Sequence, residues 1–497
     1  MDMTPSVPSR SDQSELLVDL DAPAPSVFWK AAFGCWLAGM FILYSRFFDE
    51  VLVGYSFPRI ILSLMALFFL LSGRPLVFFQ SMAGKIAIAL VFWVSFTLIF
   101  SVWKSGSLPQ YQLLVESIVI FAIAAGVPIT IGNVRKTTYA LAISGLMAAL
   151  LSFPYGADMY GRLCLRQGSY ADPNYYAMAL VLVVPFFWEM AISAKSYFVK
   201  IFAWSCMAPI FWAMMRAGSR GAMLGFGVML LFLLILSPLK TKVMLVAVTL
   251  VGLFTAVAVL PGYLRVRYFT FFDSERAQQV NPGSTNSDTP DPDQLQADVN
   301  SAEGRKRLLF TSIALTFEHP LFGVGPGNFP TAVFGESRAK GIVHNEWLVT
   351  HNSYTQISSE TGFMGVILFV ALIVIGFRNV AIVLKGTGPA AERPDANTHR
   401  LAKYLLLSLS AMCVCIFFLA VGYESTIYVW VGLTVSLRRA YEERRSVVEV
   451  AVGESDEPAS AKPAFAPVYA KAKDRMPQRT TQAPRVEGRP VRFNRFR

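Results

Sequence analysis

The sequence predicts an all-α polytopic membrane protein with about twelve transmembrane helices and a large loop between the ninth and the tenth. Three observations support this fold class. Only 15% of the 497 residues are charged and 54% are hydrophobic, whereas roughly 25% of residues in soluble domains are charged. The mean hydropathy is +0.47. The apolar residues also form blocks of about 20, the length at which a helix crosses a bilayer with its backbone fully hydrogen-bonded.

Twelve apolar blocks predict the transmembrane helices one by one. They cover residues 28–45, 58–73, 84–103, 111–130, 136–153, 174–194, 198–215, 219–238, 243–261, 361–384, 401–421 and 423–437. Residues 28–261 would therefore hold the first nine helices and residues 351–437 the last three. The polar and acidic residues 1–27 lack the basic start and adjoining apolar stretch of a cleavable signal peptide, so we expect the first span to direct insertion.

The distribution of Lys and Arg predicts the orientation. Cations such as Arg74, Arg135 and Lys240 follow the even-numbered spans, and others begin the C-terminal tail at residues 438–497. Because cytoplasmic loops carry an excess of positive charge, we expect these connections and both termini to be cytoplasmic in a bacterial inner membrane. The odd-numbered connections would face the periplasm. This topology accounts for the formal charge of +11, so we expect no nucleic-acid partner.

Arginines on the odd-numbered connections do not follow this charge rule. They are Arg162 and Arg166, Arg216 and Arg220, and a cluster from Arg265 to Arg307. Cations retained on the disfavoured side of a membrane, next to apolar spans, usually have an anionic partner. These arginines are therefore the first candidates for ligand binding.

The loop at residues 262–350 has two parts. Residues 274–304 are polar, contain prolines and show no hydrophobic period, which predicts a flexible insertion. Residues 305–320 carry apolar side chains at helical spacing and predict an amphipathic helix on the membrane surface. The glycine-rich residues 323–330 would end this helix with a turn that can bring backbone N–H groups to a phosphate. The Pro-, Ala-, Lys- and Arg-rich tail, 438–497, is expected to be disordered.

Neither the cysteines nor the carboxylates predict a metal site or another cofactor. Cys164 is alone in a loop, and the other four cysteines lie in apolar spans, where we expect them to pack. Asp291 and Asp293 have a metal-binding spacing, but they lie among prolines in the insertion, whereas a hard cation requires a rigid oxygen cage.

Four motifs in order resemble the O-antigen ligase and O-antigen polymerase superfamily. GRLCLRQGSYADPNYYA (161–177) resembles its D-P-N motif, and AGSRGAMLGF (217–226) its Ser-Arg-Gly span start. RKRLLFTSIALTFEHPLFGVGPGNFP (305–330) has its arginine, helix and turn, and HNSYTQISSETGFMG (351–365) has its H-N-x-Y and E-T-G-x-x-G patterns. The resemblance extends roughly over residues 150–370, and the spacing of the motifs makes it more specific than any one of them.

The resemblance implies a metal-independent, inverting glycosyltransferase surrounded by membrane lipids. Such proteins use an undecaprenyl-diphosphate-linked glycan as donor and a hydroxyl of a glycan or of lipid A core as acceptor. The charge of the leaving diphosphate must be compensated, and Arg is suited to this because its guanidinium donates bidentately to phosphate. The acceptor hydroxyl also requires a base.

The resemblance assigns Arg220 and Arg305 to the diphosphate and makes His351 the general base, a role suited to a side chain with a pKa near neutrality. Each of these three assignments has a structural alternative. Arg220 could snorkel at a helix end, Arg305 could contact lipid headgroups, and the histidine could be purely structural.

Further substrate contacts are predicted at Arg216, at either Arg162 or Arg166, and at Asn352 and Tyr354. The H-N-x-Y pattern favours His351 over His344, which is also followed by Asn. We expect Asp172 to begin a helix and not to act as a catalytic carboxylate.

The motifs do not determine the identity of the acceptor, because they concern the donor chemistry, whereas the shape of the loop selects the acceptor. We favour a ligase, with an O-antigen or exopolysaccharide polymerase as the alternative and transfer to a protein hydroxyl as a third option. A glycan flippase or transporter would also have about twelve spans, but it would need charges along a central path and pseudo-symmetric halves. We find no internal repeat in the sequence.

Overall fold

The computed structural model describes residues 26–52, 57–159, 161–269, 292–339, 349–387 and 394–456. The chain divides into two units, Met1–Ser446 and Val447–Arg497. Of the second unit, the structure describes only the end of one helix. The architecture below is therefore that of the first unit.

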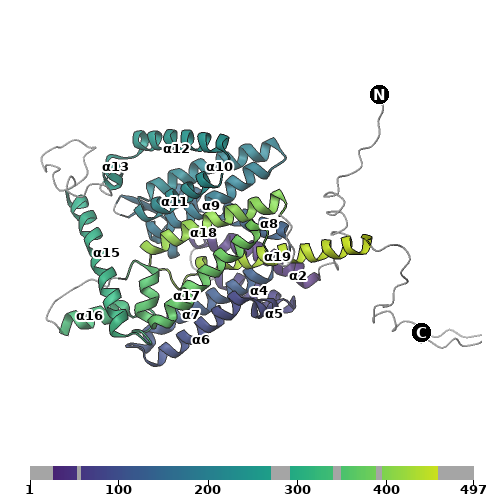
Figure 1. Ribbon diagram of the computed structural model, residues 1–497. Helices are drawn as coiled ribbons and strands as arrows, with labels where there is room; N and C mark the ends of the chain where they lie inside the picture. Colours follow the sequence, from purple (N-terminus) through teal and green to yellow (C-terminus); the bar gives the residue numbers. More distant parts are fainter. Residues whose placement is uncertain are drawn as a thin grey trace, which may run out of the picture. The chain divides into compact units, whose positions relative to one another are not determined.

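Long helices make up most of the first unit (Figure 1). They are α2 (Val27–Ser45), α4 (Phe57–Leu71), α6 (Met82–Ile99), α7 (Lys104–Gly126), α8 (Ile131–Tyr155), α9 (Pro173–Ser193), α10 (Tyr197–Arg216), α11 (Arg220–Ile235), α12 (Leu239–Val259), α15 (Pro292–Glu318), α17 (Ser353–Lys385), α18 (Ala396–Cys415) and α19 (Ser425–Asp456). Shorter elements are α3 (Phe47–Val51), α5 (Pro75–Gln80), α13 (Gly262–Phe269), α16 (Phe329–Ala339), the turns η1 (Gly168–Ala171) and η2 (Ile416–Phe418), and a hairpin of β1 (Ala157–Met159) and β2 (Arg162–Cys164).

The predicted fold class is confirmed. Among the described residues, eight helices are long and apolar enough to cross a membrane, and α4 and α11 are apolar but shorter. Every predicted span overlaps one long helix. Large apolar side chains such as Phe92, Leu231 and Ile367 are exposed on the outside of the bundle, while Trp36 and Trp430 are buried within it. An apolar exterior of this kind suits lipid.

Helix α9 lies at the centre of the bundle. It packs against α8, α10, α11 and α18, and nearly all of its side chains are buried. A helix that is apolar on every side needs such an enclosed position. Its first turn therefore provides a fixed platform at one end of the bundle.

Hydrogen bonds gather the odd-numbered connections at one end of the bundle, which we call the odd end. The donors and acceptors are Arg46 and Ser169 (3.3 Å), Arg162 and Ala217 (3.0 Å), Asn328 and Ser101 (2.6 Å), and Ser353 and Leu419 (2.6 Å). The opposite, even end is joined by bonds from Trp29 to Val127 (2.9 Å), Arg135 to Asn397 (3.1 Å), Lys403 to Leu236 (3.0 Å) and Arg439 to Ala125 (2.8 Å). The long helices therefore alternate in direction, as the predicted spans require.

Two segments predicted to lack structure are partly helical. Helix α15 begins at Pro292, so the last part of the predicted insertion at 274–304 is helix, while 270–291 lies outside the described residues. Proline fits a first helical turn, because it needs no hydrogen-bond acceptor there. Helix α19 continues through Asp456 into the predicted disordered tail, where the i,i+4 pair of Arg438 and Glu442 (2.8 Å) supports it.

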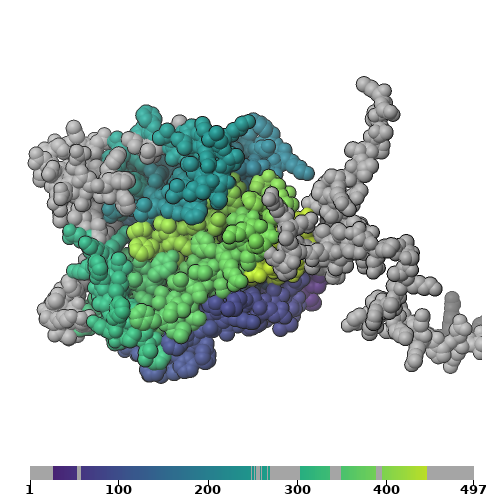
Figure 2. Space-filling view, viewed as in Figure 1, coloured from purple at the N-terminus to yellow at the C-terminus, as the bar shows by residue number. Residues whose placement is uncertain are grey.

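Of the predicted amphipathic segment at 305–320, residues 305–318 lie within α15. Its buried residues Leu308 and Leu315 form a small apolar cluster with Val324 and Phe329, and the helix packs against α17. In the space-filling view, α15 and α17 lie side by side at the odd end (Figure 2). The apolar face of this helix is therefore used at least partly within the protein.

Candidate functional site

Four arginines from four separate elements converge at the odd end. Arg162 lies on β2, Arg220 begins α11, Arg267 lies on α13 and Arg305 lies in α15. Burial, followed by the positive charges of Arg162 and Arg220, lowers the pKa of Arg305 to about 10. Burial and the other three arginines lower the pKa of Arg267 to about 9. The four residues, which we call the arginine cluster, thus form a concentrated positive charge that an anion would stabilise.

The turn between α10 and α11 holds two of these arginines in place. Arg162 Nε donates to the Ala217 carbonyl (3.0 Å) and Arg267 Nε to the Gly218 carbonyl (2.9 Å). Gly218 has φ +60°, and a Cβ there would lie 2.9 Å from the Leu264 side chain. This left-handed turn therefore needs glycine, both for its backbone and for the close approach of Leu264 on α13.

The Ser-Arg-Gly motif places Arg220 at the end of this turn. Ser219 caps α11 by accepting a hydrogen bond from Ala222 N (3.4 Å), which satisfies a free donor of the first turn. A Cβ on Gly221 would lie 2.8 Å from Phe418, so this glycine permits the close approach of η2. The motif fixes the start of the helix and thereby the position of Arg220.

Asp172 is a carboxylate close to the arginine cluster. It caps α9 by accepting hydrogen bonds from Asn174 N (2.6 Å) and Tyr175 N (3.3 Å), as expected for the start of a helix. The neighbouring Asn174 side chain accepts a bond from Arg162 Nη2 (2.7 Å). The negative charge of Asp172 opposes the lowering of the Arg305 pKa. The D-P-N motif therefore serves both the helix and the cluster.

His351 adjoins the arginine cluster in an unusual backbone conformation. Its φ is +51°, and a left-handed residue other than glycine costs roughly 1–3 kcal/mol unless its surroundings hold it. Asn352 holds it from one side, because its side chain caps α17 by accepting from Tyr354 N (2.9 Å) and Thr355 N (3.1 Å). Burial and then the charge of Arg305 lower the pKa of His351 from 6.5. The imidazole is therefore neutral at neutral pH and can accept a proton.

The glycine-rich turn docks into a break in α17. Gly362 has φ +73° and ψ −174°, which interrupts the helix. Across the break, Val324 N donates to the Ser359 carbonyl and Gly325 N to the Glu360 carbonyl, both at 2.9 Å. The Glu360 side chain accepts from Gly327 N (2.7 Å) and from the Tyr423 hydroxyl (2.8 Å). Glu360 thus joins the turn to the start of α19.

A family model described as O-antigen ligase matches residues 205–370 of the chain. This region belongs to the O-antigen ligase family. No curated protein matches the chain. The matched O-antigen ligase region contains Arg220, Arg267, Arg305 and His351, whereas Arg162 comes from the preceding hairpin. The candidate site is thus assembled from the O-antigen ligase region and the start of α9 with its hairpin.

The structure distinguishes Arg162 from Arg166, which the sequence leaves open. Arg162 lies in the arginine cluster, while Arg166 is exposed and lines a pocket beside it. Arg216 ends α10 with its guanidinium 5.8 Å from the centroid of the Trp212 ring. Among these three predicted helpers, Arg162 interacts electrostatically with Arg267 and Arg305.

Asn352 and Tyr354, which are predicted to contact substrate, make hydrogen bonds within the protein. Asn352 is buried and caps α17, as described above. The Tyr354 hydroxyl donates to the Cys413 carbonyl (3.1 Å), and its ring packs against Phe369 and Phe417. These contacts hold the start of α17, which directly follows His351.

The glycine-rich turn uses its backbone N–H groups within the protein, which corrects the prediction that they bind a phosphate. Its backbone N–H groups at Val324, Gly325 and Gly327 are bonded to residues 359–360, so they do not point to a ligand. The Asn328 side chain also ties the turn to Ser101 (2.6 Å). Buried backbone N–H groups normally have a hydrogen-bond partner, and residues 359–360 provide it for these groups.

The arginine cluster includes Arg267, a residue that is absent from the predicted site. The signal for it was present, because Arg267 belongs to the run of arginines that disobeys the charge rule beside an apolar span. No motif singles it out from Arg265, and only packing of α13 on the α10–α11 turn distinguishes the two.

Proposed function

We propose that the protein transfers a glycan from an undecaprenyl-diphosphate donor to an acceptor hydroxyl at the periplasmic face of the inner membrane. The observation that carries this proposal is the convergence of four arginines and a neutral histidine at the odd end. Arg305 Nε is buried and has no hydrogen-bond partner among the described residues, and buried donors of this kind normally have a partner. A diphosphate provides both the missing negative charge and the missing acceptors.

The chemistry follows from this arrangement. The guanidinium groups bind the diphosphate and stabilise the charge that develops on it as it leaves. His351 takes the proton from the acceptor hydroxyl, and the hydroxyl oxygen attacks the anomeric carbon while the bond to the diphosphate oxygen breaks. Attack from the face opposite the leaving group inverts the anomeric configuration. The arginines perform the charge compensation in this mechanism, so it requires no metal.

The orientation rests on the charge rule. The even end carries the cation-rich connections and the beginning and end of the bundle, so we place it and both termini in the cytoplasm. The odd end then faces the periplasm, where the lipid-linked donor can reach the arginine cluster along the membrane.

Transfer by the purified protein tests this function. We expect conversion of the lipid-linked donor in detergent or nanodiscs, and a loss of at least about 100-fold in Arg305→Ala and His351→Ala, the size typical for removal of charge stabilisation or a general base. Lys306→Ala, an exposed neighbour on α15, is the matched control and should keep wild-type rates. Wild-type transfer in either site variant would remove that residue from the mechanism, and a wild-type protein that converts no donor would reject the function.

The choice between ligase and polymerase is decided by the glycans of a deletion strain. We propose a ligase that uses lipid A core, and its loss should leave lipid-linked polymer that is not attached to lipopolysaccharide. Accumulation of single repeat units would instead identify an O-antigen or exopolysaccharide polymerase.

A further inference from the structure

Arg46, between α2 and α3, is an arginine of the odd end that lies outside both the arginine cluster and the matched region 205–370. Its guanidinium donates from Nη1 to the Asp49 carboxylate (3.1 Å) and from Nη2 to the Ser169 hydroxyl (3.3 Å). It also lies 5.4 Å from the centroid of the Tyr170 ring, a distance at which a cation is attracted to an aromatic face. The side chain of Arg46 therefore connects the α2–α3 corner to η1.

The backbone at Arg46 fixes the direction of this side chain. Arg46 ends α2 and begins α3 with φ +55° and ψ +17°. Among the described residues other than glycine, Arg46 and His351 are the ones with a positive φ. A left-handed backbone is unfavourable for a residue with a Cβ and persists where the surrounding structure enforces it. The corner between the two helices is therefore a rigid base for the guanidinium.

The segment that Arg46 contacts, residues 167–171, connects the hairpin to α9, and we call it the η1 segment. Its further hydrogen-bond partners come from α2, α3 and the connection before α19: Gln167 N donates to the Glu50 carboxylate (2.7 Å), the Tyr170 hydroxyl to the Tyr44 carbonyl (3.1 Å) and the Ser169 hydroxyl to the Glu424 carboxylate (3.5 Å). Gly168 has φ +65°, and a Cβ there would lie 3.3 Å from Arg46 Nη1. Glycine at this position therefore admits the guanidinium.

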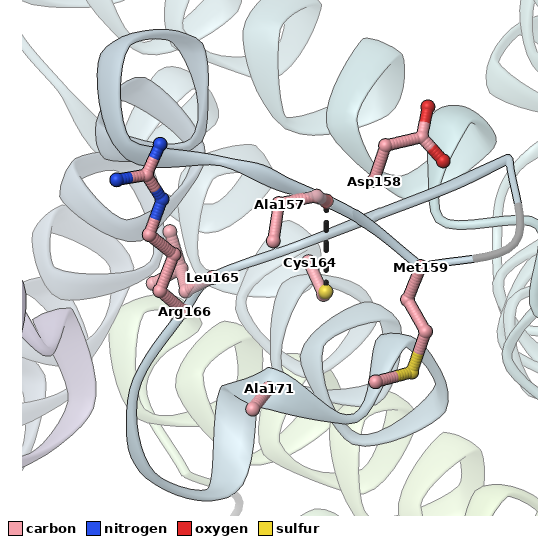
Figure 3. A pocket seen from close by; sticks show the side chains of 7 residues that line it. All are labelled: Ala157, Asp158, Met159, Cys164, Leu165, Arg166 and Ala171. Carbon is pink, nitrogen blue, oxygen red and sulfur yellow. Dashed lines mark hydrogen bonds between the residues drawn. The ribbon is translucent and has the colours of Figure 1, made fainter.

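The hairpin contacts the η1 segment less closely. A backbone bond from Leu165 N to the Tyr170 carbonyl (3.0 Å) joins the two, but a pocket of about 460 Å³ lies between them. Figure 3 shows this pocket, to which Arg166 and Ala171 contribute from either end of the segment. All of its lining residues lie within 157–171, and a cavity provides no packing for the side chains around it. The position of the η1 segment therefore depends on the α2–α3 corner and on the connection before α19.

Asp172 directly follows the η1 segment. Asp172 N donates to the Ser169 carbonyl (3.4 Å), so the residue that accepts from Arg46 also bonds to Asp172. The Asp172 carboxylate caps α9 and opposes the effect of Arg305 on His351. We propose that Arg46 is a positioning residue that acts through Ser169 and holds the Asp172 carboxylate in its place near His351. This inference rests on the proposed function, because it gives the general base of that reaction a distant support.

The pH dependence of the reactivity of His351 tests this role without requiring turnover. Diethyl pyrocarbonate modifies the unprotonated imidazole, so its rate of reaction with the half-buried His351, followed against pH by peptide mass spectrometry of the purified protein, gives the pKa. Arg46→Gln should move this curve to lower pH, in the direction of Asp172→Asn and by part of its size. A direct charge effect would do the opposite, because loss of a nearby positive charge raises the pKa of an imidazole.

A double variant and two controls sharpen the test. Arg46→Gln with Asp172→Asn should give the curve of Asp172→Asn alone, because no carboxylate then remains to be positioned. Arg59→Gln, which removes an exposed arginine near the start of α4, should behave like the wild type, and the exposed His399 on α18 is the reference within each sample. Ser169→Ala removes the link without removing a charge, so it should also move the curve to lower pH and replaces Arg46→Gln if that variant does not insert.

The outcomes separate this role from the transfer reaction. An unchanged curve in Arg46→Gln or in Asp172→Asn, a shift to higher pH in Arg46→Gln, or a shift that adds in full in the double variant overturns the positioning role. An equal shift of the His399 curve would indicate a general loss of structure and also overturns it. If the wild type transfers no glycan while the curves shift as expected, the proposed function fails and the positioning of Asp172 stands.

Discussion

The histidine at position 351 lies between charges of opposite sign. Arg305 on α15 lowers the pKa of His351 and Asp172 at the start of α9 raises it, with burial as the largest contribution. Arg162, Arg220 and Arg267 complete the charged surroundings on β2, α11 and α13. A general base must be unprotonated to act, so these neighbours decide how far into acid the enzyme retains its activity.

The pH dependence of transfer should report this arrangement. Asp172→Asn removes the negative charge that stabilises the imidazolium, so it should lower the pKa of His351 further and move the acid limb of the rate profile to lower pH. The measurement is the initial rate of transfer against pH at saturating donor.

The substitution has a built-in structural control. Asparagine caps a helix about as well as aspartate, so Asp172→Asn should leave the thermal stability of α9 and of the protein unchanged, whereas Asp172→Ala loses both the cap and the charge. An acid limb that stays in place, or that moves to higher pH in Asp172→Asn, would show that the carboxylate does not act on His351.

Among the helices, α17 is the element that assembles the site. Its first part carries the Asn352 cap beside His351, its break at Gly362 receives the glycine-rich turn, and its second part spans the bundle. Phe363 N donates to the Pro320 carbonyl across this break (2.9 Å), so the end of α15 is held there too. His351 and Arg305 are therefore positioned through one joint.

Substitution of Gly362 should disrupt this joint. A Cβ there would lie 2.0 Å from the Leu321 carbonyl oxygen, and φ is +73°, so Gly362→Ala should cost at least about 1–3 kcal/mol of strain and lower both the unfolding temperature and the transfer rate. Both quantities can be measured on detergent-purified protein.

Gly376 provides the comparison on the same helix. A Cβ there meets its nearest atoms at 3.5 Å, an ordinary contact, so Gly376→Ala should have a small effect. Equal stability and activity in Gly362→Ala and Gly376→Ala would mean that the break in α17 is not required.

Taken as one bundle, the molecule has two ends of different character. The odd end collects the arginine cluster, His351 and the hairpin, while the even end collects the connections that are rich in Lys and Arg. In Figure 1 the odd end is the side where α15 and α16 are labelled. We propose that lipid-linked substrates reach the site at this end along the membrane.

Labelling of single cysteines should show these ends on opposite sides of the membrane. We expect Lys306→Cys at the odd end to react with a membrane-impermeant maleimide on intact spheroplasts, and Lys195→Cys at the even end to react only after permeabilisation. Both lysines are exposed, and the wild type gives the background of the five natural cysteines, of which Cys164, Cys206 and Cys415 are buried. Labelling of both variants from the same side would contradict the alternating topology.

The fold class and the main catalytic candidates could be predicted from the sequence, because both depend on patterns of residues that are close together in the chain. Hydropathy and charge are properties of contiguous residues, and they placed every span on a helix. Arg220, Arg305 and His351 stand in motifs whose spacing is also local, and the arginines that violate the charge rule pointed to the end of the molecule where an anion would bind.

The packing of distant segments decided the rest. Whether Arg162 or Arg166 joins Arg305 depends on how the hairpin meets the α10–α11 turn, 55 residues farther along the chain. Arg267 enters the cluster only because α13 returns to the same turn. Likewise, the N–H groups of the glycine-rich turn and the side chains of Asn352 and Tyr354 are engaged by partners inside the protein. Hydrogen-bond partners and neighbouring charges are chosen in three dimensions, so no local pattern in the chain can specify them.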